Sequence, residues 1–212
     1  MTYPNRRRRR AFTREDGGGS PEWAADPEEG SSGERSGRRG EDPEAKARAV
    51  CLQMLTAAPR TRAQLADALR RRGIPEETAE AVLGRFSEVG LVDDEAFADA
   101  WVSSRHAGRG LARRALATEL RHRGVDEETV REAVERLDPD QELETARHLV
   151  ARKLRGTRGL DPAARIRRLS GMLARKGYSP GTAYRVVKEA LEAEGVEDLY
   201  GLDGLDETEI DG

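Results

Sequence analysis

One spacing recurs three times in this chain of 212 residues, and it constrains the fold more than any other feature. The glycines Gly73, Gly124 and Gly177 lie 51 and 53 residues apart. Two leucines precede each glycine, by eight and by four residues, and a threonine follows it by five. These residues are Leu65, Leu69 and Thr78, then Leu116, Leu120 and Thr129, then Leu169, Leu173 and Thr182. Matching positions in three copies predict a tandem array of one structural unit.

Each copy is predicted to form three helices, because apolar residues recur at helical spacing and no convincing β alternation is present. The glycine ends the middle helix, where a left-handed residue without Cβ avoids a steric clash. Thr61-x-x-Gln64 has the pattern of a capping box at the start of the first middle helix. Other helix start signals are Pro75, Asp126, Asp161-Pro162 and Ser179-Pro180. The first helices of the three copies are expected at about 44–57, 93–105 and 140–155.

The predicted fold class is therefore all-α, with three tandem three-helix repeats in an elongated, curved arrangement. The predicted repeats cover residues 43–91, 92–138 and 139–195. A unit of this size is marginal alone, so neighbouring units are expected to stabilise each other. Residues 1–42 have almost no aliphatic side chains and are predicted to be a disordered N-terminal tail. Residues 196–212 are predicted to be an acidic, disordered C-terminal tail.

Two aromatic residues lie close together in a chain that has only 4% aromatic residues. Phe97 and Trp101 are one turn apart on the first helix of the second repeat. Asp93 or Asp94 is expected to cap that helix, where the helix dipole favours acids. The preferred interpretation is that both rings belong to the core of the middle repeat. An aromatic patch that binds a partner is the alternative.

The sequence offers no arrangement of residues for catalysis, and we expect no enzyme activity, no metal and no cofactor. The three histidines, His106, His122 and His148, are far apart and have no Cys or carboxylate at metal-ligand spacing. The segment Gly108 to Gly110 lacks the other elements of a phosphate-binding loop. The one cysteine, Cys51, lies among apolar residues and is expected to be buried. A single cysteine fits a reducing compartment, and no apolar run is long enough to span a membrane, so a cytoplasmic protein is expected.

Charge is strongly segregated along the chain although the net charge is only −3. Residues 147–176 contain ten Lys or Arg and one acid, whereas residues 189–212 contain ten acids and no base. The middle helices carry most of the arginines, and the third helices of the first two repeats begin with glutamates. A helix-turn-helix protein that recognises DNA bases is disfavoured, because the DNA phosphates would repel those glutamates.

A basic strip is predicted near the starts of the middle helices. The helix dipole accounts for cations near helix ends, such as Arg71 and Arg123, without any binding role. It does not account for five arginines near helix starts, which are Arg113, Arg114, Arg165, Arg167 and Arg168. The alternative is a solvated basic face with no specific partner.

The central repeat resembles the signature of the RecX family of bacterial regulatory proteins. The residues that carry the resemblance are Gly90 to Asp94, Phe97-Ala98, Trp101-Val102, Arg105, Gly110, Arg113-Arg114, Leu116, Leu120 and Gly124-Val125. The resemblance covers about residues 44–195, is specific in the second repeat and looser in the outer two. Asp93, Asp94, Phe97, Trp101, Leu116, Leu120 and Gly124 are its structural signature in this chain.

The resemblance implies a cytoplasmic protein of DNA recombination, DNA repair and the SOS response that modulates the RecA recombinase. A monomer is expected, because the sequence has no long coiled-coil heptad run. By this resemblance the chain would lie in the groove of the RecA–DNA filament and inhibit ATP hydrolysis and strand exchange, with weak direct contact to DNA. The first choices for contact residues are Arg105, Arg109, Arg113 and Arg114, followed by Arg165, Arg167 and Arg168. Two alternatives stay open. One is a helical-repeat protein that binds DNA independently of RecA, and the other is a scaffold whose acidic tail docks elsewhere.

Overall fold

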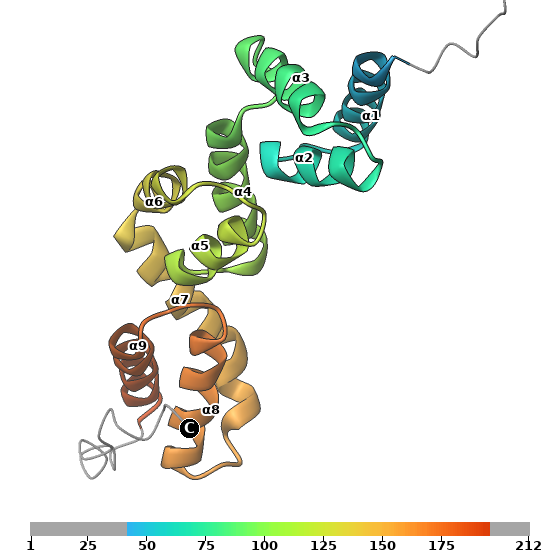
Figure 1. Ribbon diagram of the computed structural model, residues 1–212. Helices are drawn as coiled ribbons and strands as arrows, with labels where there is room; N and C mark the ends of the chain where they lie inside the picture. Colours follow the sequence, from blue (N-terminus) through green and yellow to red (C-terminus); the bar gives the residue numbers. More distant parts are fainter. Residues whose placement is uncertain (1–41, 196–212) are drawn as a thin grey trace, which may run out of the picture. The chain divides into compact units, whose positions relative to one another are not determined.

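The computed structural model describes residues 42–195, and within this range the chain is helical without any strand (Figure 1). The helices are α1 (Pro43–Ala57), α2 (Arg62–Arg71), α3 (Glu76–Glu88), α4 (Asp94–Arg109), α5 (Arg113–Arg121), α6 (Glu127–Glu135), α7 (Pro139–Leu154), the short 3-10 helix η1 (Arg155–Thr157), α8 (Pro162–Ala174) and α9 (Pro180–Ala193). The two predicted tails lie outside the described residues, except for Asp42, whose carboxylate accepts from the Glu44 N–H at the start of α1.

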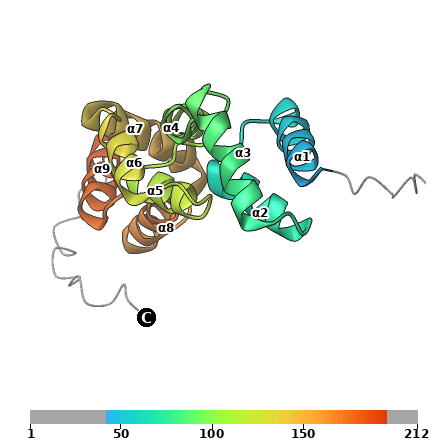
Figure 2. The same ribbon diagram turned by 45° about the horizontal axis from the view of Figure 1, so that its top comes forward.

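The helices pack in three consecutive trios, α1–α3, α4–α6 and α7–α9, as Figure 1 shows; Figure 2 gives the same helices from a second direction. Each trio has its own cluster of buried apolar side chains. The six leucines of the repeat pattern, Leu65, Leu69, Leu116, Leu120, Leu169 and Leu173, are all at most 1% exposed. The prediction of an all-α fold made of three-helix repeats is therefore confirmed.

The predicted signals define the ends of most helices. Thr61 and Gln64 form the capping box of α2, and Asp161 and Ser179 cap α8 and α9. Helix α4 is longer than the predicted 93–105, because the helix continues until Gly110 adopts a φ of 63°. The three glycines of the repeat pattern, Gly73, Gly124 and Gly177, follow the middle helices and have φ values of 70°, 79° and 88°, which lie in the left-handed region.

Successive repeats meet through hydrogen bonds at equivalent places. The Thr61 hydroxyl, before α2, donates to the carbonyl of Arg123 in the second repeat at 2.6 Å. The Ala112 N–H, before α5, donates to the carbonyl of Lys176 in the third repeat at 2.8 Å. Each of these carbonyls belongs to the residue just before the turn glycine. The start of one middle helix therefore rests on the turn that ends the next one.

A carboxylate from the following repeat completes each junction. The Arg62 N–H at the start of α2 donates to Asp94 Oδ1 at 2.8 Å, and the Arg113 N–H at the start of α5 donates to Glu142 Oε1 at 2.8 Å. Unpaired N–H groups at a helix start favour such an acceptor. Asp93 caps α4 itself, through the Ala96 N–H at 2.8 Å, so Asp94 is free to cap the neighbouring repeat. Burial raises the pKa of Asp94, and the Arg62 N–H opposes that rise.

Candidate functional site

The aromatic pair lies at the edge of the second core and not at its centre. The rings of Phe97 and Trp101 stack with 5.7 Å between their centroids, and both residues are half-buried. The guanidinium groups of Arg105 and Arg123 lie 4.0 and 3.6 Å from the centroid of the Trp101 ring. The indole N–H of Trp101 donates to Glu119 Oε2 at 2.8 Å, and Arg105 pairs with the same oxygen at 3.4 Å. Arg105, a predicted contact residue, is thus engaged inside its own repeat.

Two further predicted contact residues are also engaged in the fold. The Arg113 guanidinium donates to the Leu137 carbonyl and lies 3.7 Å from Glu142 at the junction of the second and third repeats. Arg165 is only 5% exposed. Its guanidinium donates to Thr157 Oγ1 at 3.0 Å and to Glu194 Oε2 at 2.5 Å. A role of these arginines in partner binding stays a prediction. In the structure, each of them makes contacts within the fold.

Hydrogen bonds from two arginines lower the pKa of Glu194, the acid that pairs with Arg165. The guanidinium of Arg165, followed by that of Arg158, keeps the pKa of the Glu194 carboxyl below its ordinary value. Arg158 reaches Glu194 Oε1 at 2.8 Å. Glu194 therefore joins the end of α9 to η1 and to the start of α8.

The other four predicted contact residues are exposed. They are Arg109, Arg114, Arg167 and Arg168. Within residues 42–195 their guanidinium groups have no ion pair, hydrogen bond or ring contact. Arg109 ends α4, Arg114 lies in the first turn of α5, and the other two lie on α8. These four exposed arginines are the part of the predicted basic strip that remains available to an anionic partner.

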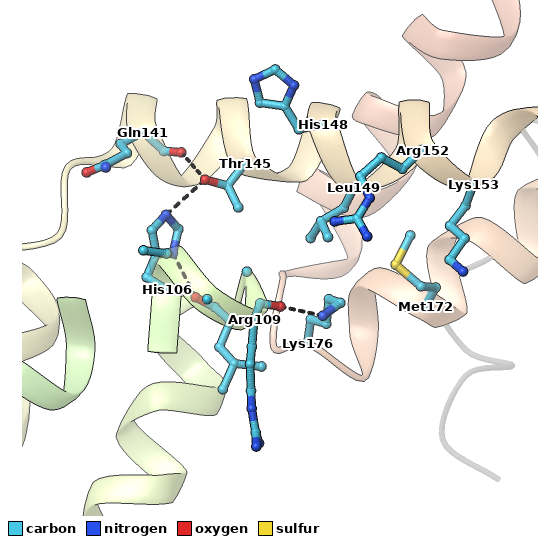
Figure 3. A pocket seen from close by; sticks show the side chains of 14 residues that line it. His106, Arg109, Gln141, Thr145, His148, Leu149, Arg152, Lys153, Met172 and Lys176 are labelled. Atoms are coloured by element: carbon cyan, nitrogen blue, oxygen red, sulfur yellow. Dashed lines mark hydrogen bonds between the residues drawn. The ribbon is translucent and has the colours of Figure 1, made fainter. Parts of the chain in front are cut away.

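One of the four lines a pocket that the sequence did not predict. The pocket lies where the end of α4 meets α7 and α8, and its volume is about 580 Å³ (Figure 3). Arg109, Arg152, Lys153 and Lys176 line it, and none of its 14 lining residues is acidic. We call it the basic pocket. Arg152 and Lys153 lie on α7, outside the middle helices in which the strip was predicted, although the run of ten bases over residues 147–176 includes them.

Apolar side chains share the basic pocket with the cations. Leu149 and Met172 are half-buried and lie beside Arg152 and Lys153 (Figure 3). Arg152 and Lys153 are exposed and have no ion pair or hydrogen bond within residues 42–195. They lie in the last turn of α7, where the helix dipole stabilises cations. The pocket therefore combines an apolar wall with a cationic rim.

Hydrogen bonds hold the wall of the pocket in place. Lys176 Nζ donates to the Arg109 carbonyl at 2.5 Å, which satisfies a carbonyl at the end of α4. The buried His106 ring lies 2.8 Å from the Leu111 carbonyl through Nδ1 and 2.9 Å from Thr145 Oγ1 through Nε2. These contacts join α4 to α7 and α8, as the dashed lines of Figure 3 show. The pocket is thus built into the junction of the second and third repeats.

Other classes of site receive no support from residues 42–195. No group of three or more His, Cys, Asp or Glu in this range is placed to hold a metal ion. No helix of this range has the length and apolar character that crossing a membrane requires. Cys51 is buried and free, and burial raises the pKa of its thiol, which makes the thiolate scarce.

Comparisons with known proteins agree with the repeat structure. Three family models, described as the first, second and third three-helix domains of RecX, match residues 47–86, 93–134 and 140–187. The Regulatory protein RecX of Thermobifida fusca (strain YX) is 66% identical over 177 residues, which are 84% of this chain and 95% of that protein. The protein of the same name from Streptomyces coelicolor is 65% identical over 165 residues, covering 78% and 88% of the two chains.

Solved structures show the same fold. The crystal structure of RecX from Lactobacillus salivarius matches with a TM-score of 0.66 and 18% identity, over 70% of this chain and 96% of that one. A second crystal structure, of a regulatory protein RecX, matches with a TM-score of 0.63 and 26% identity, over 70% and 72% of the two chains.

Proposed function

Because the chain belongs to the RecX family of regulatory proteins, we propose that it binds the RecA recombinase and RecA–DNA filaments and mainly inhibits them. The observation that carries this proposal is the 66% identity to a Regulatory protein RecX over 95% of that protein. The activities affected are ATP hydrolysis and strand exchange. The protein is proposed to act as a cytoplasmic monomer in DNA repair and in the SOS response, with no catalysis of its own.

The proposed mechanism is occupation of the groove of the filament. DNA phosphates and acidic protein surfaces are both anionic, and exposed cations without internal partners are free to meet them. The four exposed arginines, together with Arg152 and Lys153, are the proposed contact residues. Arginine suits this role because its planar group donates two parallel hydrogen bonds to a phosphate or a carboxylate.

The test is a titration of the purified chain into RecA assembled on single-stranded DNA. We expect the rate of ATP hydrolysis and the yield of strand exchange to fall as the chain is added. Arg109→Glu with Arg114→Glu should weaken that inhibition, whereas Arg185→Glu, an exposed arginine of α9 outside the proposed contacts, should leave it unchanged. Unchanged RecA activity at stoichiometric amounts of the wild-type chain would contradict the proposal.

Direct binding to DNA without RecA is the second candidate function, and the exposed cations without partners favour it. Contacts to phosphates release counterions, so the affinity for labelled single-stranded DNA should fall steeply as salt increases. Tight binding of DNA by the chain alone, combined with RecA that does not respond to it, would favour this alternative.

A further inference from the structure

The basic pocket concentrates positive charge without a counter-charge among the described residues that line it. Arg109, Arg152 and Lys153 have no ion pair or hydrogen bond from their charged groups within residues 42–195, and Lys176 is satisfied only by a neutral carbonyl. Like charges around one cavity repel each other, so an anionic group that enters it is favoured. The apolar wall of Leu149 and Met172 also favours an occupant with aliphatic or aromatic groups beside its charges.

The chain itself contains a segment with that chemistry. Residues 196–212 have seven acids and no lysine or arginine. Leu199, Tyr200, Leu202, Leu205 and Ile210 lie among those acids. The carboxylates match the cationic rim of the pocket, and the apolar side chains match its wall.

The last described residues of α9 lie about two turns of α8 from the pocket. The ion pair between Glu194 and Arg165 places the end of α9 beside the start of α8. Met172 of the pocket lies seven residues further along α8, which is about 10 Å at the helical rise of about 1.5 Å per residue. The 17 residues that follow Gly195 can span at most about 56 Å. The segment can therefore reach the pocket without any change in α8 or α9.

We propose that residues 196–212 dock in the basic pocket of their own chain and compete there with the phosphates of single-stranded nucleic acid. A short connection gives the segment a high effective concentration at the pocket, about millimolar, so weak contacts are sufficient for occupancy. The docking itself rests only on the pocket and the segment. The competition rests on the proposed function, since it concerns the anion that the docked segment excludes.

The first experiment measures docking directly. All three cores lie within residues 42–195, so a chain that ends at Gly195 keeps them intact. A fluorescent peptide of residues 196–212 is titrated with that shortened chain, and we expect an increase in anisotropy that salt suppresses. Arg152→Glu with Lys153→Glu should weaken binding at least tenfold, whereas Arg185→Glu should not change it. A peptide whose seven acids are replaced by their amides should not bind.

The second experiment uses the full chain and labelled oligothymidylate as the phosphate probe. At low salt the shortened chain should bind the probe several-fold more tightly than the full chain, and added peptide should reverse the gain. Amide hydrogen exchange of α7 in the full chain should be slower than in the shortened chain, which reports docking without any nucleic acid.

The outcomes separate the two proposals. Absence of peptide binding, or peptide binding that survives the reversal of Arg152 and Lys153, would overturn docking in the basic pocket. Peptide binding with equal affinity of both chains for oligothymidylate would overturn the competition. If the peptide docks as expected and RecA does not respond to either chain, the proposed function fails while the docking stands.

Discussion

At the scale of single residues, Gly177 combines a left-handed backbone with a close approach of another repeat. Its φ is 88°, and an added Cβ would overlap the backbone N and the Cβ of Ala115. Gly73 has a φ of 70° but no atom within 4 Å of an added Cβ. Gly73→Ala should therefore lower the free energy of unfolding by about 1–2 kcal/mol, the cost of the left-handed conformation alone. Gly177→Ala should lower it by clearly more, and equal losses in urea denaturation would contradict the role of Gly177 at the junction.

Two adjacent arginines at the start of α5 are expected to have different roles, Arg113 in stability and Arg114 in binding. Arg113 donates to the Leu137 carbonyl and pairs with Glu142, whereas Arg114 is exposed without a partner within residues 42–195. Arg113→Ala should lower the free energy of unfolding by about 1–3 kcal/mol, because it removes charge-assisted hydrogen bonds. Arg114→Ala should change it by no more than about 0.5 kcal/mol while it weakens binding to RecA filaments. Chemical denaturation and a filament-binding assay measure the two effects, and the reverse assignment would contradict this interpretation.

At the scale of helices, one carboxylate couples the end of α9 to α8 and makes stability depend on pH. The pKa of Glu194 is lower in the folded chain than in the unfolded one, where it is about 4.3. Its contribution is therefore present above pH 4.3 and is lost as pH falls through the folded pKa. Glu194→Gln should be less stable than wild type at pH 7, and the two melting temperatures should converge in acid. Glu192→Gln, at an exposed position of α9, should stay parallel to wild type, and a parallel course for Glu194→Gln would contradict the coupling.

The sequence predicts the helices well because their end signals are local. Thr61, Asp161 and Ser179 each cap a helix through a backbone N–H within a few residues, so a single stretch of sequence contains the whole interaction. The contacts of Asp94 and Arg165 join residues that are 32 and 29 positions apart. No periodicity in one helix reveals such partners.

The candidate site was predicted incompletely for the same reason. Sorting the arginines by helix identifies the exposed Arg114 and Arg168 as candidate contact residues. It does not distinguish them from Arg113 and Arg165, because the acids that pair with these two lie on other elements. The basic pocket forms only when α4, α7 and α8 meet, and Arg152 on α7 was therefore missed as a site residue.

At the scale of the whole molecule, three separate cores are joined by a small set of junction contacts. Each core draws almost all of its residues from one trio, with Ala112 of the second repeat as an exception in the third core. In such arrays stability is the sum of terms within repeats and terms between neighbours. Damage to one junction should therefore loosen the repeats beside it and leave a distant repeat unchanged.

Thr61→Val tests this nearest-neighbour behaviour. The Thr61 hydroxyl accepts from the Gln64 N–H and donates to the Arg123 carbonyl, so the substitution removes a helix cap and a junction bond together. A lost cap costs about 1 kcal/mol, and the buried carbonyl adds to that cost. Amide hydrogen exchange should accelerate in the two repeats that the junction joins, α1–α3 and α4–α6, and stay unchanged in α7–α9. Ser179→Ala, which removes a cap of α9 but no hydrogen bond between repeats, should accelerate exchange in the third repeat only. Equal acceleration in all nine α-helices of residues 42–195 would instead mean that the repeats unfold as one unit.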